Sequence, residues 1–224
     1  MSNPEFVIVT AATPDYARQA SVFMPSWIRH SGAKEIIVRT LPDPEKTSRW
    51  ECQVERNVVV RDVVLDAKRR GLRVAMLDID CWTLGSLHDA FDGIHPLGVA
   101  RWPLINCGVQ FYDTLLEYDF EGFLNKVVNR VRAALDAYKK GNRIGLVEQK
   151  AWEREFHAVG DDVNKLNEDV WNLCVADNRW QQKLNEMKDK VRIVHVKGRG
   201  EHKHQDWRIR TAYEVFGDRI KPDV

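Results

Sequence analysis

The segment RVAMLDIDCWTL, which begins at Arg73, places two aspartates one residue apart at the end of an apolar run. Alternate side chains of an extended chain share a face, so Asp78 and Asp80 can reach one point while Ile79 turns toward the core. Two neighbouring carboxylates repel each other unless a positive charge lies between them. The pair therefore predicts a site for a hard divalent cation such as Mn²⁺ or Mg²⁺. The simpler alternative is two acids in a surface turn.

A histidine near the other end of the chain is a candidate third ligand. His195 stands in the segment IVHVKGRG, with apolar residues before it and a basic, glycine-containing turn after it. A neutral imidazole supplies a nitrogen ligand and favours Mn²⁺ over ions that bind oxygen alone. Lys197 and Gly198 suit contacts to a phosphate group. The alternative is a core histidine whose hydrogen bonds are satisfied within the protein.

Apolar runs and helix-end signals alternate along the chain. The apolar runs predict strands at 6–12, 34–40 and 74–77, from Pro96, from Asn106 and from Val191. Helical spacing and end signals predict helices from Thr13 to about His30, from about Glu51 to Gly71, from Phe120 to about 139, and near 206–216. This alternation favours one α/β domain with a mainly parallel central sheet, whose ligands bind beyond the carboxyl ends of the strands.

Composition and charge are those of an ordinary globular protein. The chain has 224 residues, with 34 lysines and arginines against 33 acids, so it has no overall charge to attract nucleic acid or a membrane. Its four cysteines lack zinc-site spacing and are expected to be reduced packing residues: Cys52, Cys81, Cys107 and Cys174. The sequence shows neither a signal peptide nor an apolar run of the ~20 residues that span a bilayer. We expect a cytoplasmic protein, in the host cytosol if it is viral.

Several short motifs occur in a telling order. The two aspartates are followed by NCGV at 106–109, by the pair Glu148 and Gln149, by LNEDVWN at 166–172 and by HVKG at 195–198. In this order the chain resembles nucleotide-sugar glycosyltransferases of the GT-A fold, in particular the family of glycogenin and the bacterial galactosyltransferases. The resemblance implies a single-domain, Rossmann-like αβα sandwich over 1–224. Its nucleotide-binding part would be about 1–100 and its sugar and acceptor part about 101–224.

The resemblance also implies roles for individual residues. The metal ligands would be Asp78, Asp80 and His195. The diphosphate would be held by Lys197 and Gly198, and the nucleotide base would be contacted by Thr10, Ala11 and Tyr16. The donor sugar would be lined by Asn106, Cys107 and Gly108, with Arg61 helping to hold the donor. Glu148 and Gln149 would lie beside the reacting carbon, where the family usually has aspartate and glutamine.

The implied reaction is metal-dependent transfer of a hexose or pentose from a nucleotide-diphosphate sugar, by default a UDP-sugar, to a hydroxyl acceptor. The resemblance favours retention of configuration. Glu148 could act as a base on the acceptor if the enzyme inverts, and Gln149 could support the cationic sugar if it retains. The acceptor could be a polysaccharide, or a hydroxylated base in DNA, because 197–210 is rich in basic residues. The oligomeric state is not predicted.

Two other classes of function fit parts of the sequence. LDIDCWTL and the later VGDDVNKLNED resemble the motifs of haloacid-dehalogenase-like phosphohydrolases, although Cys81 and Trp82 make the first motif one residue too long. A non-catalytic module that binds sugar nucleotides or nucleic acid is the other alternative. Among the eight tryptophans, Trp82 and Trp102 lie close enough to the proposed motifs to line a sugar pocket, although packing in the core is the simpler role.

Overall fold

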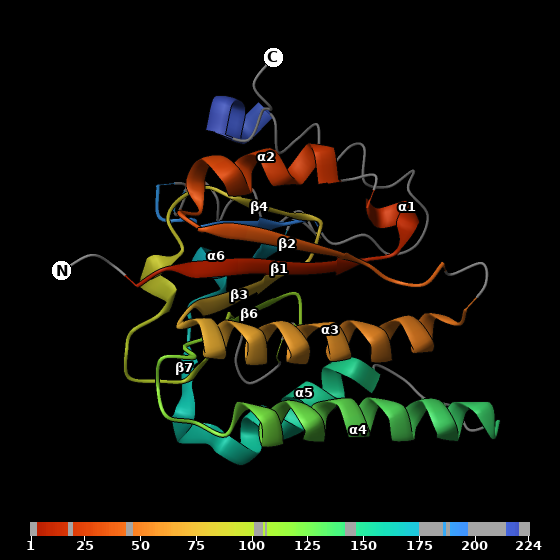
Figure 1. The fold of residues 1–224 in the computed structure, drawn as a ribbon. Helices are drawn as coiled ribbons and strands as arrows, with labels where there is room; N and C mark the ends of the chain where they lie inside the picture. Colours follow the sequence, from red (N-terminus) through yellow and green to blue (C-terminus); the bar gives the residue numbers. More distant parts are fainter. Residues whose placement is uncertain are drawn as a thin grey trace.

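The structure, a computed structural model, describes residues 4–17, 20–43, 47–100, 105, 107–141, 147–174, 186, 189–196 and 214–219. Its centre is a six-stranded sheet in the order β2-β1-β3-β6-β5-β7 (Figure 1). The strands, in that order, are β2 (Glu35–Thr40), β1 (Phe6–Ala12), β3 (Arg73–Leu77), β6 (Val109–Tyr112), β5 (Leu97–Val99) and β7 (Val163–Lys165). The predicted strands at these positions are thereby confirmed; β7 was not predicted.

Five of these strands run in one direction. β1 pairs in parallel with β2 and β3, and β5 pairs in parallel with β7. β6 is antiparallel to both of its neighbours, β3 and β5. The link between β5 and β6 is too short for the crossover that parallel neighbours need, which explains the reversal. The prediction of a mainly parallel sheet is confirmed, and the reversed strand is an addition that the sequence pattern did not reveal.

Helices cover both faces of the sheet. α1 (Pro14–Ala17) follows β1 at its carboxyl end, and α2 (Ala20–His30) covers one face. The other face is covered by α3 (Arg49–Arg70), α4 (Phe120–Lys139) and α5 (Val147–Val159). Figure 1 shows α2 above the sheet and α3, α4 and α5 below it. This is the αβα sandwich that the sequence predicts.

α3 carries one wall of the site, and its two ends explain why a valine-rich segment is helical. The Ser48 side chain accepts a hydrogen bond from the Glu51 amide while the Glu51 carboxylate accepts one from the Ser48 amide, which is a capping box. At the other end Gly71 adopts a left-handed conformation with φ 67° and closes the helix. These end signals outweigh the strand preference of the valines, and the predicted helix is confirmed.

α4 presents its apolar residues on one side. Its buried side chains are the seven that the sequence spacing selects: Phe120, Phe123, Leu124, Val127, Val128, Val131 and Leu135. All of them except Val128 join the core formed with the sheet, α3 and α5. α4 is therefore a packing helix that holds α3 and α5 in place beside the pocket.

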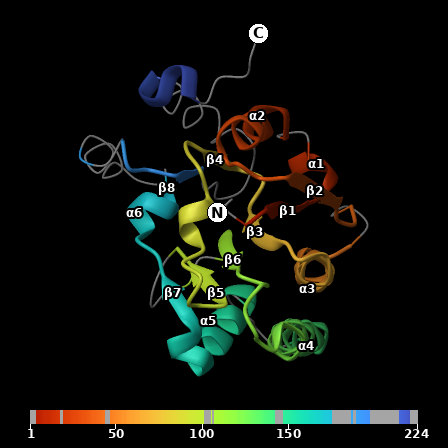
Figure 2. The same cartoon turned by 60° about the vertical axis from the view of Figure 1, so that its left-hand side comes forward.

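A second sheet of three short strands brings the late histidine to the aspartates. It consists of β4 (Cys81–Thr83), β9 (Ile193–His195) and β8 (Leu173–Cys174), in the order β4-β9-β8. β8 follows α6 (Glu168–Trp171), and Figure 2 shows these two elements close to each other. Cys81 pairs with His195, and the Val196 amide donates to the Asp80 carbonyl at 2.9 Å. The last strand was predicted, whereas β4 and β8 were not.

The described part of the chain also contains three single 3₁₀ turns, at His88–Ala90, Gly160–Asp162 and Gly217–Arg219, the last preceded by helical residues at 214–216. Phe216 is buried, and the Arg219 guanidinium donates to the Leu84 carbonyl at 2.8 Å, so 214–219 packs against the segment that follows β4. Most of the helix expected at 206–216 lies outside the described residues. None of the helices in the described part of the chain combines the length and apolar character needed to cross a membrane.

Candidate active site

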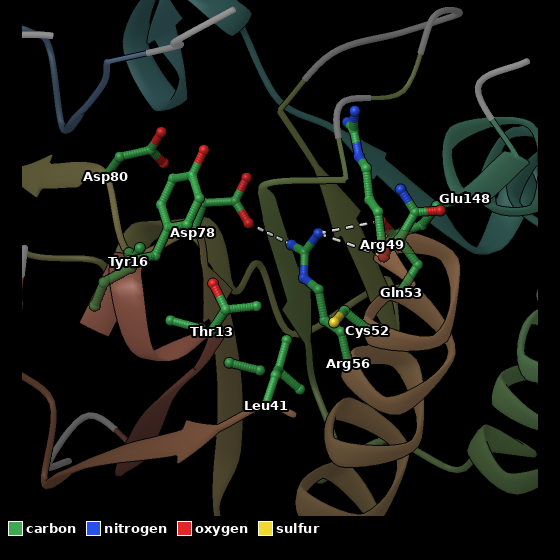
Figure 3. Close-up of a pocket in the computed structure, with 13 residues that line it drawn as sticks. Thr13, Tyr16, Leu41, Arg49, Cys52, Gln53, Arg56, Asp78, Asp80 and Glu148 are labelled. Carbon is green, nitrogen blue, oxygen red and sulfur yellow. Dashed lines mark hydrogen bonds and ion pairs between the residues drawn. The ribbon is translucent and has the colours of Figure 1, made fainter. Parts of the chain in front are cut away.

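A cavity of about 290 Å³ opens at the carboxyl edge of the central sheet. β1, β3 and their following turns form one side, and α3 forms the other (Figure 3). Its lining residues are Ala11, Ala12, Thr13, Tyr16, Leu41, Arg49, Cys52, Gln53, Arg56, Asp78, Ile79, Asp80 and Glu148. A mixed apolar and polar cleft at this edge of an α/β sheet is where ligands bind.

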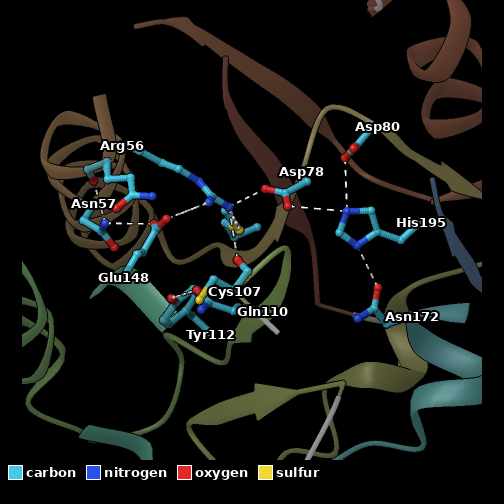
Figure 4. Close-up of polar contacts among 12 residues, drawn as sticks. Arg56, Asn57, Asp78, Asp80, Cys107, Gln110, Tyr112, Glu148, Asn172 and His195 are labelled. Atoms are coloured by element: carbon cyan, nitrogen blue, oxygen red, sulfur yellow. Dashed lines mark hydrogen bonds and ion pairs between the residues drawn. The ribbon is translucent and has the colours of Figure 1, made fainter. Parts of the chain in front are cut away.

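Arg56 is the central cation of this cavity. Its guanidinium forms an ion pair with Asp78 and donates to the Cys107 carbonyl at 3.1 Å (Figure 4). It also contacts both carboxylate oxygens of Glu148 at 3.3 Å. Burial opposes the charge of Arg56, but Asp78 and Glu148 raise its pKa, so the guanidinium remains charged. Arg56 thus links the first aspartate of the motif to the glutamate of α5.

Glu148 is a buried carboxylate with every oxygen engaged. Beyond its contacts with Arg56, it accepts a hydrogen bond from the Asn57 side chain at 2.9 Å. Burial raises the pKa of Glu148, Arg56 lowers it, and the neighbouring Asp78 raises it, with a net increase. Its charge therefore depends on Arg56.

His195 lies between the two aspartates and Asn172. Its Nε2 atom is 3.1 Å from Asp80 Oδ1 and 3.5 Å from Asp78 Oδ2, and its Nδ1 atom is 3.0 Å from Asn172 Oδ1. An amide oxygen only accepts, so in this arrangement Nδ1 donates to Asn172. In the neutral ring the Nε2 lone pair then points at two carboxylates (Figure 4). A cation between them would turn this repulsion into coordination.

Gly108 provides the strongest test of whether a cation fits. A Cβ atom at this position would lie 2.3 Å from Asp78 Oδ2 and 2.6 Å from His195 Cε1. Only a glycine therefore leaves room for the aspartate and the histidine to approach each other. The donors that meet here are carboxylate oxygens and an imidazole nitrogen, a set that suits Mn²⁺. The residues present fit a divalent cation.

Gly108→Ala is expected to weaken Mn²⁺ binding by at least about tenfold, because the new methyl group must displace Asp78 or His195, and disturbing a metal-ligand environment typically costs 10–100-fold. Isothermal titration of the variant with Mn²⁺ measures this loss. Gly160→Ala is the matched control, since a Cβ there meets nothing within 4 Å. Equal affinity of Gly108→Ala and the wild-type protein for Mn²⁺ would contradict the assignment.

The structure brings most of the predicted site residues together. Asp78, Asp80, Glu148, Ala11 and Tyr16 line the cavity. His195 contacts the aspartates, as described above. The Cys107 carbonyl accepts from Arg56, and the Gly108 carbonyl accepts from the Asp78 amide at 2.7 Å. Thr10, which precedes Ala11 in β1, is 1% exposed and is not among the residues that line the cavity, and its hydroxyl has no hydrogen-bond partner among the described residues.

Other predicted residues lie elsewhere. Arg61 contacts Asp62 and Asn125 and does not line the cavity. The Gln149 side chain donates a hydrogen bond to the Glu153 carboxylate, one turn further along α5, at 2.9 Å. It therefore lies along α5 and does not line the cavity, whereas its neighbour Glu148 does.

Trp82 does not line the cavity, and the position of Trp102 and of three other predicted residues is not described. Trp82 is fully buried, packs on Phe23 and donates to the Val22 carbonyl, so a sugar-lining role for it is wrong. Its ring belongs to an apolar cluster that also contains Leu84, Leu173 and Val194. The following residues lie outside the described part of the chain: Asn106, Lys197, Gly198 and Trp102.

Sequence reasoning missed Arg56, Asn57 and Asn172. A signal for Arg56 was present, because four residues that line the cavity recur at helical spacing on α3: Arg49, Cys52, Gln53 and Arg56. Arg61, which the resemblance placed near the donor, lies about 1.4 helical turns further along α3, where it is directed away from the cavity. No local pattern distinguishes Asn172 from an ordinary helix-end asparagine.

The acids expected in the phosphohydrolase alternative lie at the opposite edge of the sheet. Asp161 and Asp162 are in the turn that precedes β7, whereas Asp78 follows β3. β3, β5 and β7 run in the same direction, so the start of β7 and the end of β3 are at opposite edges. The two motifs therefore do not form one phosphohydrolase site.

The chain matches no protein-family model and no curated protein, but its structure is similar to solved glycosyltransferases. One is involved in the glycosylation of the major capsid of PBCV-1; it has a TM-score of 0.64 and 16% identity, with 92% of this chain and 100% of that chain covered. GlyE from Streptococcus pneumoniae TIGR4 has a TM-score of 0.57 and 16% identity, with 92% and 60% covered. Mouse xyloside xylosyltransferase 1 has a TM-score of 0.55 and 12% identity, with 86% and 98% covered.

The chain has the GT-A glycosyltransferase fold. The predicted resemblance is thereby confirmed for the fold. On the GT-A fold, the cavity beside Asp78 and Asp80 lies at the end of the first and third strands, where α3 faces them. The cavity also draws on Glu148, so it combines residues from both of the predicted parts of the chain. That division into parts stays a prediction.

Proposed function

We propose that this protein is a metal-dependent glycosyltransferase that moves a sugar from a nucleotide-diphosphate sugar, a UDP-sugar in the first instance, to a hydroxyl acceptor. The observation that carries the proposal is the meeting of Asp78, Asp80 and His195 beside the cavity of a GT-A fold. A non-catalytic module that binds a sugar nucleotide would need the same cavity, but it would not need the ion pair of the largely buried Arg56 and the buried Glu148 in its wall.

The parts of the donor have distinct surroundings in this proposal. The nucleotide base lies against Tyr16, Thr13 and Leu41, and Tyr16 is 40% exposed and can stack on it. Asp78, Asp80 and His195 would hold the metal ion. When bound, Mn²⁺ neutralises negative charge on the diphosphate, the leaving group.

The contact between Arg56 and Glu148 limits what Glu148 can do in the transfer step. Because Glu148 is bound by Arg56 and Asn57, it is poorly placed to remove a proton from an acceptor. Its carboxylate can instead stabilise positive charge on the sugar as the bond to the diphosphate breaks. The acceptor oxygen then bonds to the anomeric carbon, and its proton passes to a diphosphate oxygen. This arrangement supports retention, with Glu148 in the role that the sequence analysis gave to Gln149.

We propose a saccharide hydroxyl as the acceptor. The PBCV-1 protein is involved in the glycosylation of a capsid and the mouse protein is a xyloside xylosyltransferase, and both names are compatible with a saccharide acceptor. A hydroxylated base in DNA stays the second prediction, since the basic segment that suggests it lies outside the described residues. Binding of DNA that weakens steeply with added salt would support it.

The first test is a thermal-shift screen of nucleoside diphosphates and nucleotide sugars, with and without Mn²⁺. A ligand present at a hundred times its dissociation constant stabilises the folded state by about 2.7 kcal/mol. For a chain of this size that corresponds to a rise in Tm of roughly 5–10 °C. We expect a rise with one nucleotide only when Mn²⁺ is present, followed by slow hydrolysis of its sugar ester. No Mn²⁺-dependent rise with any nucleotide would contradict the proposal.

A further inference from the structure

Cys81 lies in the same row of the second sheet as His195. The two residues are direct partners in the antiparallel pair of β4 and β9, so their side chains project from the same face. The Cys81 thiol, an Asp80 carboxylate oxygen and a His195 ring nitrogen all lie within 4.8 Å of one another. Cys81 was expected to be a packing residue, but it lies beside the residues of the proposed metal site.

The separations suit three ligands of one ion. Around a tetrahedral Zn²⁺ with bonds of about 2.0–2.3 Å, ligand atoms lie roughly 3.3–3.7 Å apart. Asp80 Oδ1 and His195 Nε2 are already 3.1 Å apart. All three donor atoms already lie within 4.8 Å of one another. Rotation of the side chains is therefore enough to bring the Cys81 sulfur to a coordinating distance from the same ion.

The backbone around Cys81 is held firmly. The Trp27 indole donates to the Cys81 carbonyl at 2.7 Å, and the Cys81 amide donates to the Asp78 carbonyl at 3.2 Å. Cys81 is fully buried and His195 is 2% exposed. The thiol is therefore confined to the neighbourhood of the imidazole, and the protein shields both groups from water.

His195 is oriented for coordination through one nitrogen. Its Nδ1 atom contacts Asn172 Oδ1 at 3.0 Å, and Asn172 is fully buried. A ligating histidine usually donates its other ring N–H to such an acceptor, which fixes the ring and makes the ligating nitrogen more basic. Nε2 is therefore the atom presented to Asp80 and to any ion between them.

We propose that Cys81 is a metal ligand, and that with Asp80 and His195 it forms a mixed sulfur, nitrogen and oxygen site that binds Zn²⁺ more tightly than Mn²⁺. Thiolate and imidazole donors favour Zn²⁺, whereas Mn²⁺ and Mg²⁺ prefer oxygen. The inference rests on the metal site of the proposed function, but it does not depend on the transfer reaction. Zn²⁺ and Mn²⁺ would compete for one position and exclude each other.

The test uses the full-length protein after treatment with a chelator. Zn²⁺ affinity is measured by competition with a chromogenic chelator, for the wild-type protein and for Cys81→Ser and Cys81→Ala. Removing a residue that hydrogen-bonds to a metal ligand typically lowers metal affinity by about 10–100-fold. Removing the ligand itself is therefore expected to weaken Zn²⁺ binding by at least about a hundredfold. Mn²⁺ affinity should change less than Zn²⁺ affinity does, because Mn²⁺ depends on the carboxylates and the imidazole.

The matched control is Cys174→Ser. Cys174 pairs with His195 from the other side, in β8, and is absent from the three-residue cluster. It should bind Zn²⁺ as the wild-type protein does. Unchanged Zn²⁺ affinity in Cys81→Ser, or a loss in Cys174→Ser alone, would overturn the assignment of Cys81.

A second test measures the absorption spectrum of the wild-type protein loaded with Co²⁺, so it does not depend on whether a variant folds. Co²⁺ bound by a thiolate absorbs in the near ultraviolet through charge transfer from sulfur, so the wild-type protein loaded with Co²⁺ should show this band. Absence of the band overturns the inference. If Mn²⁺ still binds in that case, only the role of Cys81 fails; if neither Mn²⁺ nor Zn²⁺ binds the wild-type protein, the metal site of the proposed function fails as well.

Discussion

Asp80→Asn is expected to lower Mn²⁺-dependent turnover of the nucleotide sugar by about a thousandfold, since charge stabilisation by a metal ion contributes several kcal/mol to such a reaction. The Asp80 carboxylate lies 3.1 Å from His195 Nε2 and faces the cavity. An amide is a poor ligand for Mn²⁺ and carries no charge. Turnover of the donor at saturating Mn²⁺, measured by release of the nucleoside diphosphate, reports the loss.

The same variant should fold normally. The Asp80 backbone carbonyl still accepts from Val196, and removal of one of two neighbouring carboxylates relieves their repulsion. We therefore expect a change in unfolding free energy within about 0.5 kcal/mol. Asp66→Asn, at an exposed aspartate of α3 that pairs with Arg69 and Arg70, is the control and should keep full activity. Full activity of Asp80→Asn would rule out the proposed metal site.

Arg56→Met is expected to reduce the free energy of unfolding at pH 7 by about 3 kcal/mol, the lower end of the range for breaking a buried ion pair. The side chains of Arg56 and Glu148 are 14% and 11% exposed, so water replaces little of the lost interaction. Asp78 and Glu148 would both lose their counter-charge. Urea unfolding followed by circular dichroism measures the change.

The loss should depend on pH with a definite sign. Burial already raises the pKa of Glu148, and Arg56 is the largest of the effects that lower it, so the variant raises this pKa further. A carboxyl group whose pKa is higher in the folded state favours folding most below its unfolded pKa, and this contribution is lost as pH rises through the folded pKa. The deficit of Arg56→Met should therefore be smaller at pH 4 than at pH 7.

Two further variants test this explanation. Arg61→Met, on the same helix, breaks contacts to Asp62 and Asn125 that lie outside the cavity, and should cost less than about 1 kcal/mol. Glu148→Gln in the Arg56→Met background removes the uncompensated carboxylate and should restore part of the stability. A double variant no more stable than Arg56→Met alone would show that packing, and not charge, accounts for the loss.

Local sequence was sufficient for the parts of the fold that local interactions form. Buried strands such as Phe6–Ala12 are continuous apolar runs, and α3 is delimited by its capping box and by Gly71. α4 shows its buried face directly in the spacing of its apolar residues. Strand alternation was expected to place Asp78 and Asp80 on one face, but β3 ends at Leu77 and residues 79 and 80 form a turn, in which the Cys81 amide donates to the Asp78 carbonyl. The two carboxylates therefore converge through this turn and not through an extended strand.

The partners of these residues were decided by tertiary structure. Arg56 and Glu148 are 92 residues apart in the chain, and they meet only because α4 packs α3 and α5 side by side. His195 reaches the aspartates because β9 pairs with β4, a two-sheet arrangement with no local signal. The same pairing brings Cys81 beside the histidine.

The sequence by itself determined most of the longer elements and the acids that follow β3, because helix caps and apolar periodicity act over a few residues. Only the tertiary structure decided that Arg56, and not Arg61, joins those acids. It also decided that Glu148 enters the cavity while Gln149 does not. These choices depend on the rotation of each helix about its axis, which is determined by long-range packing.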